Sequence, residues 1–271
     1  MGFRCCSMLG MIETSARLAA LFVGVLLMPA MTARAEEPEA PPVHENDLAD
    51  WDVPALTAGD WAEHELAGPS APVTSGNKRP SRRLACVAVE EELVWVEVTM
   101  KHAGKTWDGM ILSLGARKSD GKVTRACWGK AGATGTELKV RPPSGGPAVA
   151  PGSPKPTVTA SGTVTKEKTK AGSTSYECEK IELETQLTSS CCDEKARITL
   201  WVSEKVAFRA RVDEKVKVNG LEAETTWNGK PTVRGGVVKR QVSSGGSLEI
   251  MTLLRSGTDA KEALARPALK K

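Results

Sequence analysis

Cysteines are the first residues in this sequence whose types and spacing could do chemistry. Five of them follow residue 35, and thiols in an oxidising compartment pair as disulfides. We expect Cys86 to pair with Cys127, and Cys178 with Cys191 or Cys192, although five thiols allow other pairings. A bond between the adjacent Cys191 and Cys192 would strain the peptide between them. One of these two is therefore expected to pair with a distant cysteine.

Histidines and carboxylates could serve hydrolysis or metal binding, but their arrangement favours neither. The sequence has no C-x-x-C pair, and its histidines are only His44, His64 and His102. Metal binding needs ligands that converge, so we expect no metal and no cofactor. His64 and His102 lie in polar stretches, which predicts surface positions rather than general bases.

No catalytic motif is present. The chain lacks both G-x-S-x-G and H-E-x-x-H. A glycosidase with paired carboxylates stays open as an alternative, because acidic residues cluster at 90–92 and at 177–184. Alternating Glu and Lys on a strand is, however, typical of its solvent face. We therefore expect a protein without enzymatic activity.

The elements that must position these residues are predicted to be strands. In residues 93–101, Val94, Val96 and Val98 alternate with polar or aromatic residues, a period of two that indicates a strand with one apolar face. Similar patterns between Gly, Asn and Ser turns predict an antiparallel all-β fold. The expected strands are 58–66, 82–89, 93–101, 106–114, 122–129, 135–140, 157–168, 173–187, 197–203, 206–218, 222–227, 237–242 and 247–255.

Breaks in the pattern suggest how these strands are organised. Residues 141–156 are rich in Pro, Gly and Ser, which predicts a linker or long loop. It joins a first β section, 51–140, to a second, 157–271, as two domains or as two halves of one sheet. Asn219-Gly220 and Asn228-Gly229 are typical hairpin turns. Only 259–264 looks helical.

The N-terminus has the pattern of a secretory signal peptide. Arg17 precedes an apolar run at 18–28, and small residues follow up to Ala35. The run is shorter than the roughly 20 residues of a membrane-spanning helix. Cys5 and Cys6 lie before the run, not after it as in a lipoprotein signal. We expect cleavage after Ala35 and a periplasmic or extracellular protein without a transmembrane segment.

The expected mature chain begins with a leader and is nearly neutral. Residues 36–50 are acidic and Pro-rich, which predicts a disordered segment. Of the 37 basic and 33 acidic residues, three and one lie before residue 36, which leaves a net charge of +2. This balance argues against nucleic acid as a partner. The local basic patch of Lys78, Arg79, Arg82 and Arg83 is interpreted as a solvated loop.

Three motifs in the second section carry a resemblance. They are Tyr176-Glu-Cys-Glu-Lys-Ile181, Leu200-Trp-Val-Ser-Glu-Lys-Val206 and Gly235-Gly-Val-Val-Lys239. Over residues 157–255 the chain resembles exported bacterial proteins that are similar to the periplasmic lipoprotein carriers. The resemblance implies a curved antiparallel sheet or half-barrel whose concave face holds an acyl chain. The chain departs from the carriers by lacking helices to plug that face, and by having Ala207-Phe208 where Pro-Gly is common.

Two functions follow as expectations. The first is an exported binding protein that holds a lipid, a lipidated partner or another apolar ligand on the concave face. The second is a structural or surface-interaction protein without a cavity, which would use its sheet edges or tryptophans. The residues expected to line the concave face are Val94, Val96, Val98, Trp201, Val237 and Val238.

Overall fold

The structure is a computed structural model that describes residues 39–69, 71, 78–103, 107–142, 156–188, 193–218 and 221–267. The expected signal peptide, Cys191, Cys192, the turn at 219–220 and most of the expected linker lie outside these ranges. The described residues form almost only strands. The elements are β1 (Val43–His44), η1 (Val53–Ala55), β2 (Trp61–Ala67), β3 (Ser81–Val89), β4 (Leu93–Lys101), β5 (Met110–Arg117), β6 (Val123–Lys130), β7 (Thr136–Leu138), β8 (Val140–Arg141), β9 (Thr157–Ala171), β10 (Thr174–Thr188), β11 (Asp193–Ser203), β12 (Lys215–Val218), β13 (Leu221–Asn228), β14 (Gly236–Ser244) and β15 (Ser247–Gly257).

Thirteen of these strands form one curved, unclosed sheet in the order β12-β13-β9-β10-β11-β14-β15-β2-β3-β4-β5-β6-β7. The all-β prediction is confirmed. Both β sections lie in the same sheet, because β2 of the first pairs antiparallel with β15 of the second. Pairing is antiparallel except between β13 and β9, which are parallel. The short β1 and β8 form a separate parallel pair.

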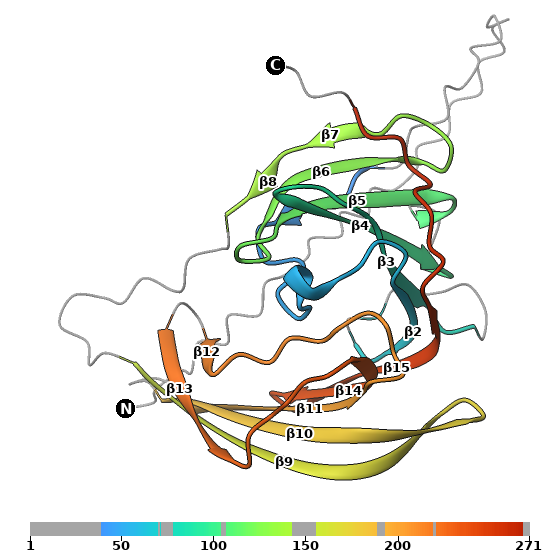
Figure 1. Cartoon of the computed structure of the whole chain (residues 1–271). Helices are drawn as coiled ribbons and strands as arrows, with labels where there is room; N and C mark the ends of the chain where they lie inside the picture. The colour runs from blue at the N-terminus through green and yellow to red at the C-terminus, as the bar shows by residue number, and fades with distance from the viewer. Residues whose placement is uncertain are drawn as a thin grey trace, which may run out of the picture. The chain divides into compact units, whose positions relative to one another are not determined.

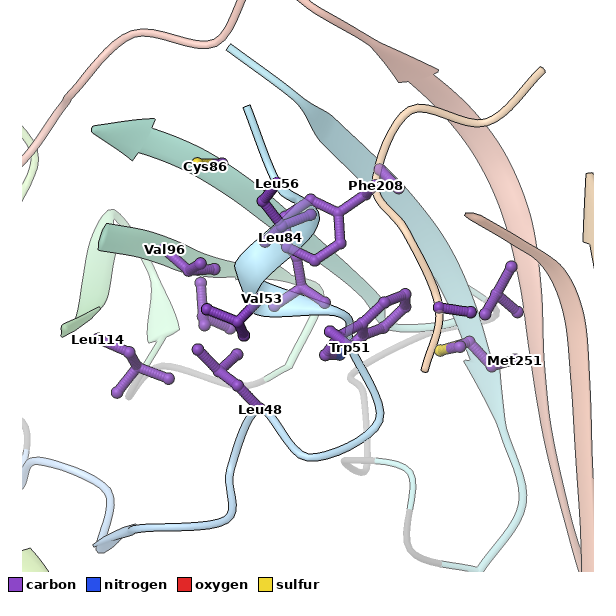
Figure 2. Packing of buried hydrophobic residues seen from close by; sticks show 14 of the residues in the cluster. Leu48, Trp51, Val53, Leu56, Leu84, Cys86, Val96, Leu114, Phe208 and Met251 are labelled. Atoms are coloured by element: carbon purple, nitrogen blue, oxygen red, sulfur yellow. The ribbon is translucent and has the colours of Figure 1, made fainter. Parts of the chain in front are cut away.

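The inner face of the sheet, which carries Val96, Leu114 and Met251, is covered by the chain itself. Residues 43–56 pack there, and Figure 1 shows this segment in the space within the curving strands. Figure 2 shows Leu48, Trp51 and Val53 among the core residues. Residues 36–50 were expected to form a disordered segment without core residues. Val43 and Leu48 differ from that expectation, because each is only 1% exposed and lies in the core.

The segment between β11 and β12 also packs on the inner face. A strand was expected over 206–218, but only the last four residues are one. Phe208 and Ala210 are buried, and the backbone makes only isolated bridges, from Arg209 to Gly236 and from Ala210 to Trp51. The apolar alternation that suggested a strand instead anchors this segment against the core.

The expected hairpin at Asn228-Gly229 is wrong. Gly229 does take a positive φ of 87°. However, β13 pairs with β12 and β9, so the chain leaves the turn without pairing back. Local turn chemistry was predicted well, but the partner strand was not, because pairing depends on distant residues.

The outer face of the sheet carries Trp95, Glu97 and Cys127, and the C-terminal segment crosses it. This segment is not the helix expected at 259–264. The Glu97 carboxylate accepts the backbone N–H groups of Ala263 and Leu264 at 3.0 Å and 2.9 Å. Leu264 is fully buried beside Cys127. These long-range contacts hold the segment extended and override its weak helical pattern.

The expected disulfide between Cys86 and Cys127 is contradicted. Both thiols are free and buried. The thiol of Cys178 is also free and buried, which contradicts its expected pairing with Cys191 or Cys192. Cys86 lies on β3 and Cys127 on β6, with two strands between them. Three strand spacings of about 4.8 Å exceed the Cα separation that a disulfide spans. Moreover, Cys86 pairs with Val96 on the inner face, whereas Cys127 lies on the outer face.

Candidate functional site

An apolar cleft lies on the inner face where β10 and β11 pair. Ile181 is opposite Leu200 and Leu183 is opposite Ile198, so alternate residues of both strands share one face. Ile181 is fully buried, whereas the other three are only partly covered. These side chains form the floor of a cleft of about 480 Å³.

The wall of the cleft comes from the two segments that pack on the inner face. Trp51 contributes from the first and Val212 from the second, and Val216 contributes from the adjoining strand β12. The Trp51 indole contacts the Phe208 ring edge to face, with ring centroids 5.1 Å apart. The floor thus comes from β10 and β11, and the wall comes largely from the two packed segments, which the contact between Trp51 and Phe208 joins.

Charged residues surround the opening. Arg240 forms an ion pair with Asp50 at 3.1 Å. Arg211 donates to Asp213 through Nε at 2.6 Å and to the carbonyl oxygen of Asp120 at 3.2 Å. An apolar floor with a few polar groups at the rim is the usual composition of a small-molecule site.

A second, smaller hollow adjoins the cleft at Arg240 and Met251, which line both. Its volume is about 160 Å³, and Arg82, Val242 and Glu249 also line it. Arg82 comes from β3, where it faces His64 of β2 across the strand pair. The expected solvated loop is therefore wrong for Arg82, which is part of the sheet and faces inward.

The guanidinium of Arg82 is poorly partnered. Its Nη2 donates to the thioether sulfur of Met251 at 3.5 Å, a weak acceptor. Its Nε is buried and has no hydrogen-bond partner among the described residues. Burial lowers the pKa of Arg82, the charge of Asp50 opposes this shift, and the neighbouring Arg240 adds to it. Two guanidinium groups thus lie close together with one carboxylate paired to Arg240.

His64 lies fully buried beside this region, so its expected surface position is wrong. Its Nε2 is 2.9 Å from the carbonyl oxygen of Val237, to which it donates as the neutral imidazole. Burial lowers its pKa to about 4. Its Nδ1 is buried and has no hydrogen-bond partner within the described ranges of the chain. His102 is exposed, as expected.

The residues expected to line the concave face fall into four groups. Val94, Val96 and Val98 are buried on the inner face, but within the core cluster that residues 43–56 complete, away from the cleft. Val237 does line the cleft. Val238, the next residue in the chain, is fully buried and does not line the cleft.

Trp201 lies on the opposite side of the sheet from the cleft. It follows Leu200, whose side chain is in the cleft, and Lys180 and Lys239 stack over its ring at 5.7 Å and 5.0 Å. Its Nε1 donates to Glu167 at 3.3 Å. Trp201 is therefore an anchor of the outer face.

The floor residues Ile181, Leu183, Ile198 and Leu200 were not proposed from the sequence as lining residues. Each pair does repeat with a period of two, which is the signal that could have found them. That signal marks one apolar face of each strand. It does not indicate which strands have their inner face covered by other segments of the chain.

In the described part of the chain the thiols of Cys86, Cys127 and Cys178 are buried. No three His, Cys, Asp or Glu side chains converge there as metal ligands. The described thiols are poor nucleophiles, because burial raises the pKa of Cys86 to about 12 and that of Cys178 to about 11. Among the described residues, no helix is long and apolar enough to cross a membrane.

Comparison with solved structures gives two weak likenesses. A candidate exported protein with a YmcC-like fold from Bacteroides fragilis is 9% identical, with a TM-score of 0.29 over 74% of this chain and 97% of that one. A candidate lipoprotein from Parabacteroides distasonis is also 9% identical, with a TM-score of 0.31 over 77% of this chain and 99% of that one. No protein-family model and no curated protein matches the chain.

Proposed function

We propose that this chain is an exported, non-enzymatic protein that binds an apolar ligand, such as an acyl chain, in the cleft over β10 and β11. The observation that carries the proposal is that Leu183, Ile198 and Leu200 converge there without being fully covered. Partly exposed apolar side chains that face one hollow gain free energy when a ligand removes them from water.

The size and construction of the cleft support this function. Its volume of about 480 Å³ falls within the range of roughly 300–1,000 Å³ for small-molecule sites. The floor is built on paired strands, which hold the lining side chains in fixed positions. A lipid, or the acyl chain of a lipidated partner, has the apolar character that the side chains of this floor accept.

Binding of an uncharged amphiphile tests the proposal. Monododecanoyl glycerol, titrated below its micellar concentration and followed by calorimetry, is expected to bind the wild-type protein at one site. Leu183→Trp and Ile198→Trp fill the cleft and should weaken binding at least about 10-fold, a loss of about 1.4 kcal/mol. Leu254→Trp is the matched control, because Leu254 is 52% exposed on β15.

Two results would count against the proposal. Absence of binding to the wild-type protein would favour a surface-interaction protein without a ligand cavity. Equal affinity for wild type and both cleft variants would place the amphiphile elsewhere.

Export rests on the basic, apolar and small-residue order of residues 1–35. We expect the mature protein recovered from the periplasm or the medium to begin at Glu36. Intact mass measurement tests this expectation, and an exported chain that retains residues 1–35 would contradict it.

A further inference from the structure

Arg82 forms no ion pair with a carboxylate among the described residues, and its Nη2 donates only to the Met251 sulfur. Asp50 is the acidic group that influences it, but Asp50 forms its ion pair with Arg240 at 3.1 Å. Arg82 itself contacts the Met251 sulfur and leaves its buried Nε unpaired. A buried donor without an acceptor costs free energy in the folded state.

Arg82 lies next to the cleft. It lines the hollow of about 160 Å³ that meets the apolar cleft at Arg240 and Met251. A molecule lying along Ile198 and Leu200 would therefore bring one end to the two guanidinium groups. Glu249 also lines this hollow, but it forms no ion pair with Arg82 among the described residues.

We propose that Arg82, together with Arg240, binds the anionic head group of an amphiphile whose apolar chain occupies the cleft. A carboxylate or phosphate oxygen would accept from the Arg82 guanidinium, replacing the weak sulfur contact with a charge-assisted hydrogen bond. This inference rests on the proposed function, and it narrows the ligand class from apolar molecules to acidic amphiphiles.

Paired ligands separate this inference from the proposed function. Dodecanoate and monododecanoyl glycerol have the same acyl chain, but only the first is an anion. Calorimetry with the wild-type protein should give at least about 10-fold tighter binding of dodecanoate, as expected for one charge-assisted hydrogen bond. Equal affinities would overturn the head-group assignment while leaving the proposed function intact. Failure of both to bind would overturn both.

Substitution then assigns the preference to a residue. Arg82→Gln should remove the preference for dodecanoate and leave the affinity for monododecanoyl glycerol unchanged. Arg79→Gln is the control, because Arg79 is an exposed neighbour that pairs with Glu65 at 2.8 Å. A preference that survives Arg82→Gln would contradict the assignment. The circular dichroism spectrum and melting curve of each variant establish that it is folded.

Free anions distinguish a lipid head group from a soluble ion. Acetate and inorganic phosphate are titrated at the concentrations at which dodecanoate saturates the protein. Neither ion should show an Arg82-dependent heat of binding, so the heats for the wild type and for Arg82→Gln should be the same. Tight binding of either ion in the wild-type protein, retained in Ile198→Trp, would identify a site for free anions and overturn the amphiphile assignment.

Discussion

The indole of Trp51 and the phenyl ring of Phe208 lie 5.1 Å apart at an interplanar angle of 79°. This edge-to-face contact joins two segments, 157 positions apart in the chain, that both pack on the inner face of the sheet. Together they cover the inner face over β3 to β5 and leave the floor over β10 and β11 partly open. The two segments that this contact joins therefore border both the core and the cleft.

Loss of the Phe208 ring should destabilise the whole sheet. Phe208 is fully buried in the core, and Phe→Ala in such a position costs about 3–5 kcal/mol. Urea denaturation followed by tryptophan fluorescence measures the change. Leu254→Ala is the control, and its 52% exposure predicts a change within about 0.5 kcal/mol. A cost for Phe208→Ala below about 1 kcal/mol would mean that the segment is not anchored as described.

The described cysteines should behave as buried free thiols. Cys86, Cys127 and Cys178 are expected to resist iodoacetamide at pH 8 in the native protein, because burial raises the pKa of each. All three should react in denaturant without a reductant. Peptide mapping by mass spectrometry separates them from Cys191 and Cys192. Labelling of Cys86 or Cys127 only after reduction would show a disulfide instead.

His64 should make stability fall in mild acid. Its folded pKa of about 4 lies below the ordinary value of 6.5, so the unfolded chain binds the proton first. The contribution of His64 is complete above pH 6.5 and is lost as pH falls toward 4. By linkage the loss is about 2–3 kcal/mol at pH 4.5.

Urea denaturation of His64→Gln at pH 7 and pH 4.5 isolates this contribution. The variant should lose less stability between the two pH values than the wild type does. His102→Gln, at an exposed position, should lose as much as the wild type. If His64→Gln and wild type have parallel pH profiles, His64 is not buried in the neutral form.

Arg82 should lower the free energy of unfolding of the protein when no ligand is bound. Arg82→Met removes an unpaired donor and places an apolar side chain beside Met251, so the free energy of unfolding should rise by about 1 kcal/mol. Thermal denaturation without ligand measures this. Arg79→Met, at a solvent-exposed ion pair, should change little. A lower melting temperature for Arg82→Met would show that Arg82 stabilises the protein rather than serving a ligand.

Local patterns predicted the strands well where one face is buried throughout. The alternation of Val94, Val96 and Val98 marked β4 and its inner face correctly. The same reasoning failed at Phe208, because a segment that packs on a sheet buries alternate residues as a strand does. Local patterns also did not predict the order of the strands in the sheet. That order places two strands between Cys86 and Cys127, so the expected disulfide does not form.

The candidate site was less accessible to sequence reasoning than the fold. Val237 was expected to line the concave face and does line the cleft. Val96 was expected there too, but its exposure depends on residues 43–56, and the acidic, Pro-rich composition of residues 36–50 had marked the first part of this segment as a disordered leader. Arg82 was the first residue of the expected strand 82–89, but the basic patch to which it belongs was interpreted as a solvated loop, so its inward-facing position on β3 was not predicted.

The location of a bound amphiphile tests the central claim most directly. Dodecanoic acid with a photoreactive diazirine near its methyl end can be cross-linked to the exported protein and mapped by tryptic peptides. We predict labelling in peptides 181–195 and 198–205, which carry the floor residues Leu183 and Ile198. An excess of dodecanoate should abolish this labelling. Labelling of other peptides, or labelling that dodecanoate does not displace, would contradict a ligand site in this cleft.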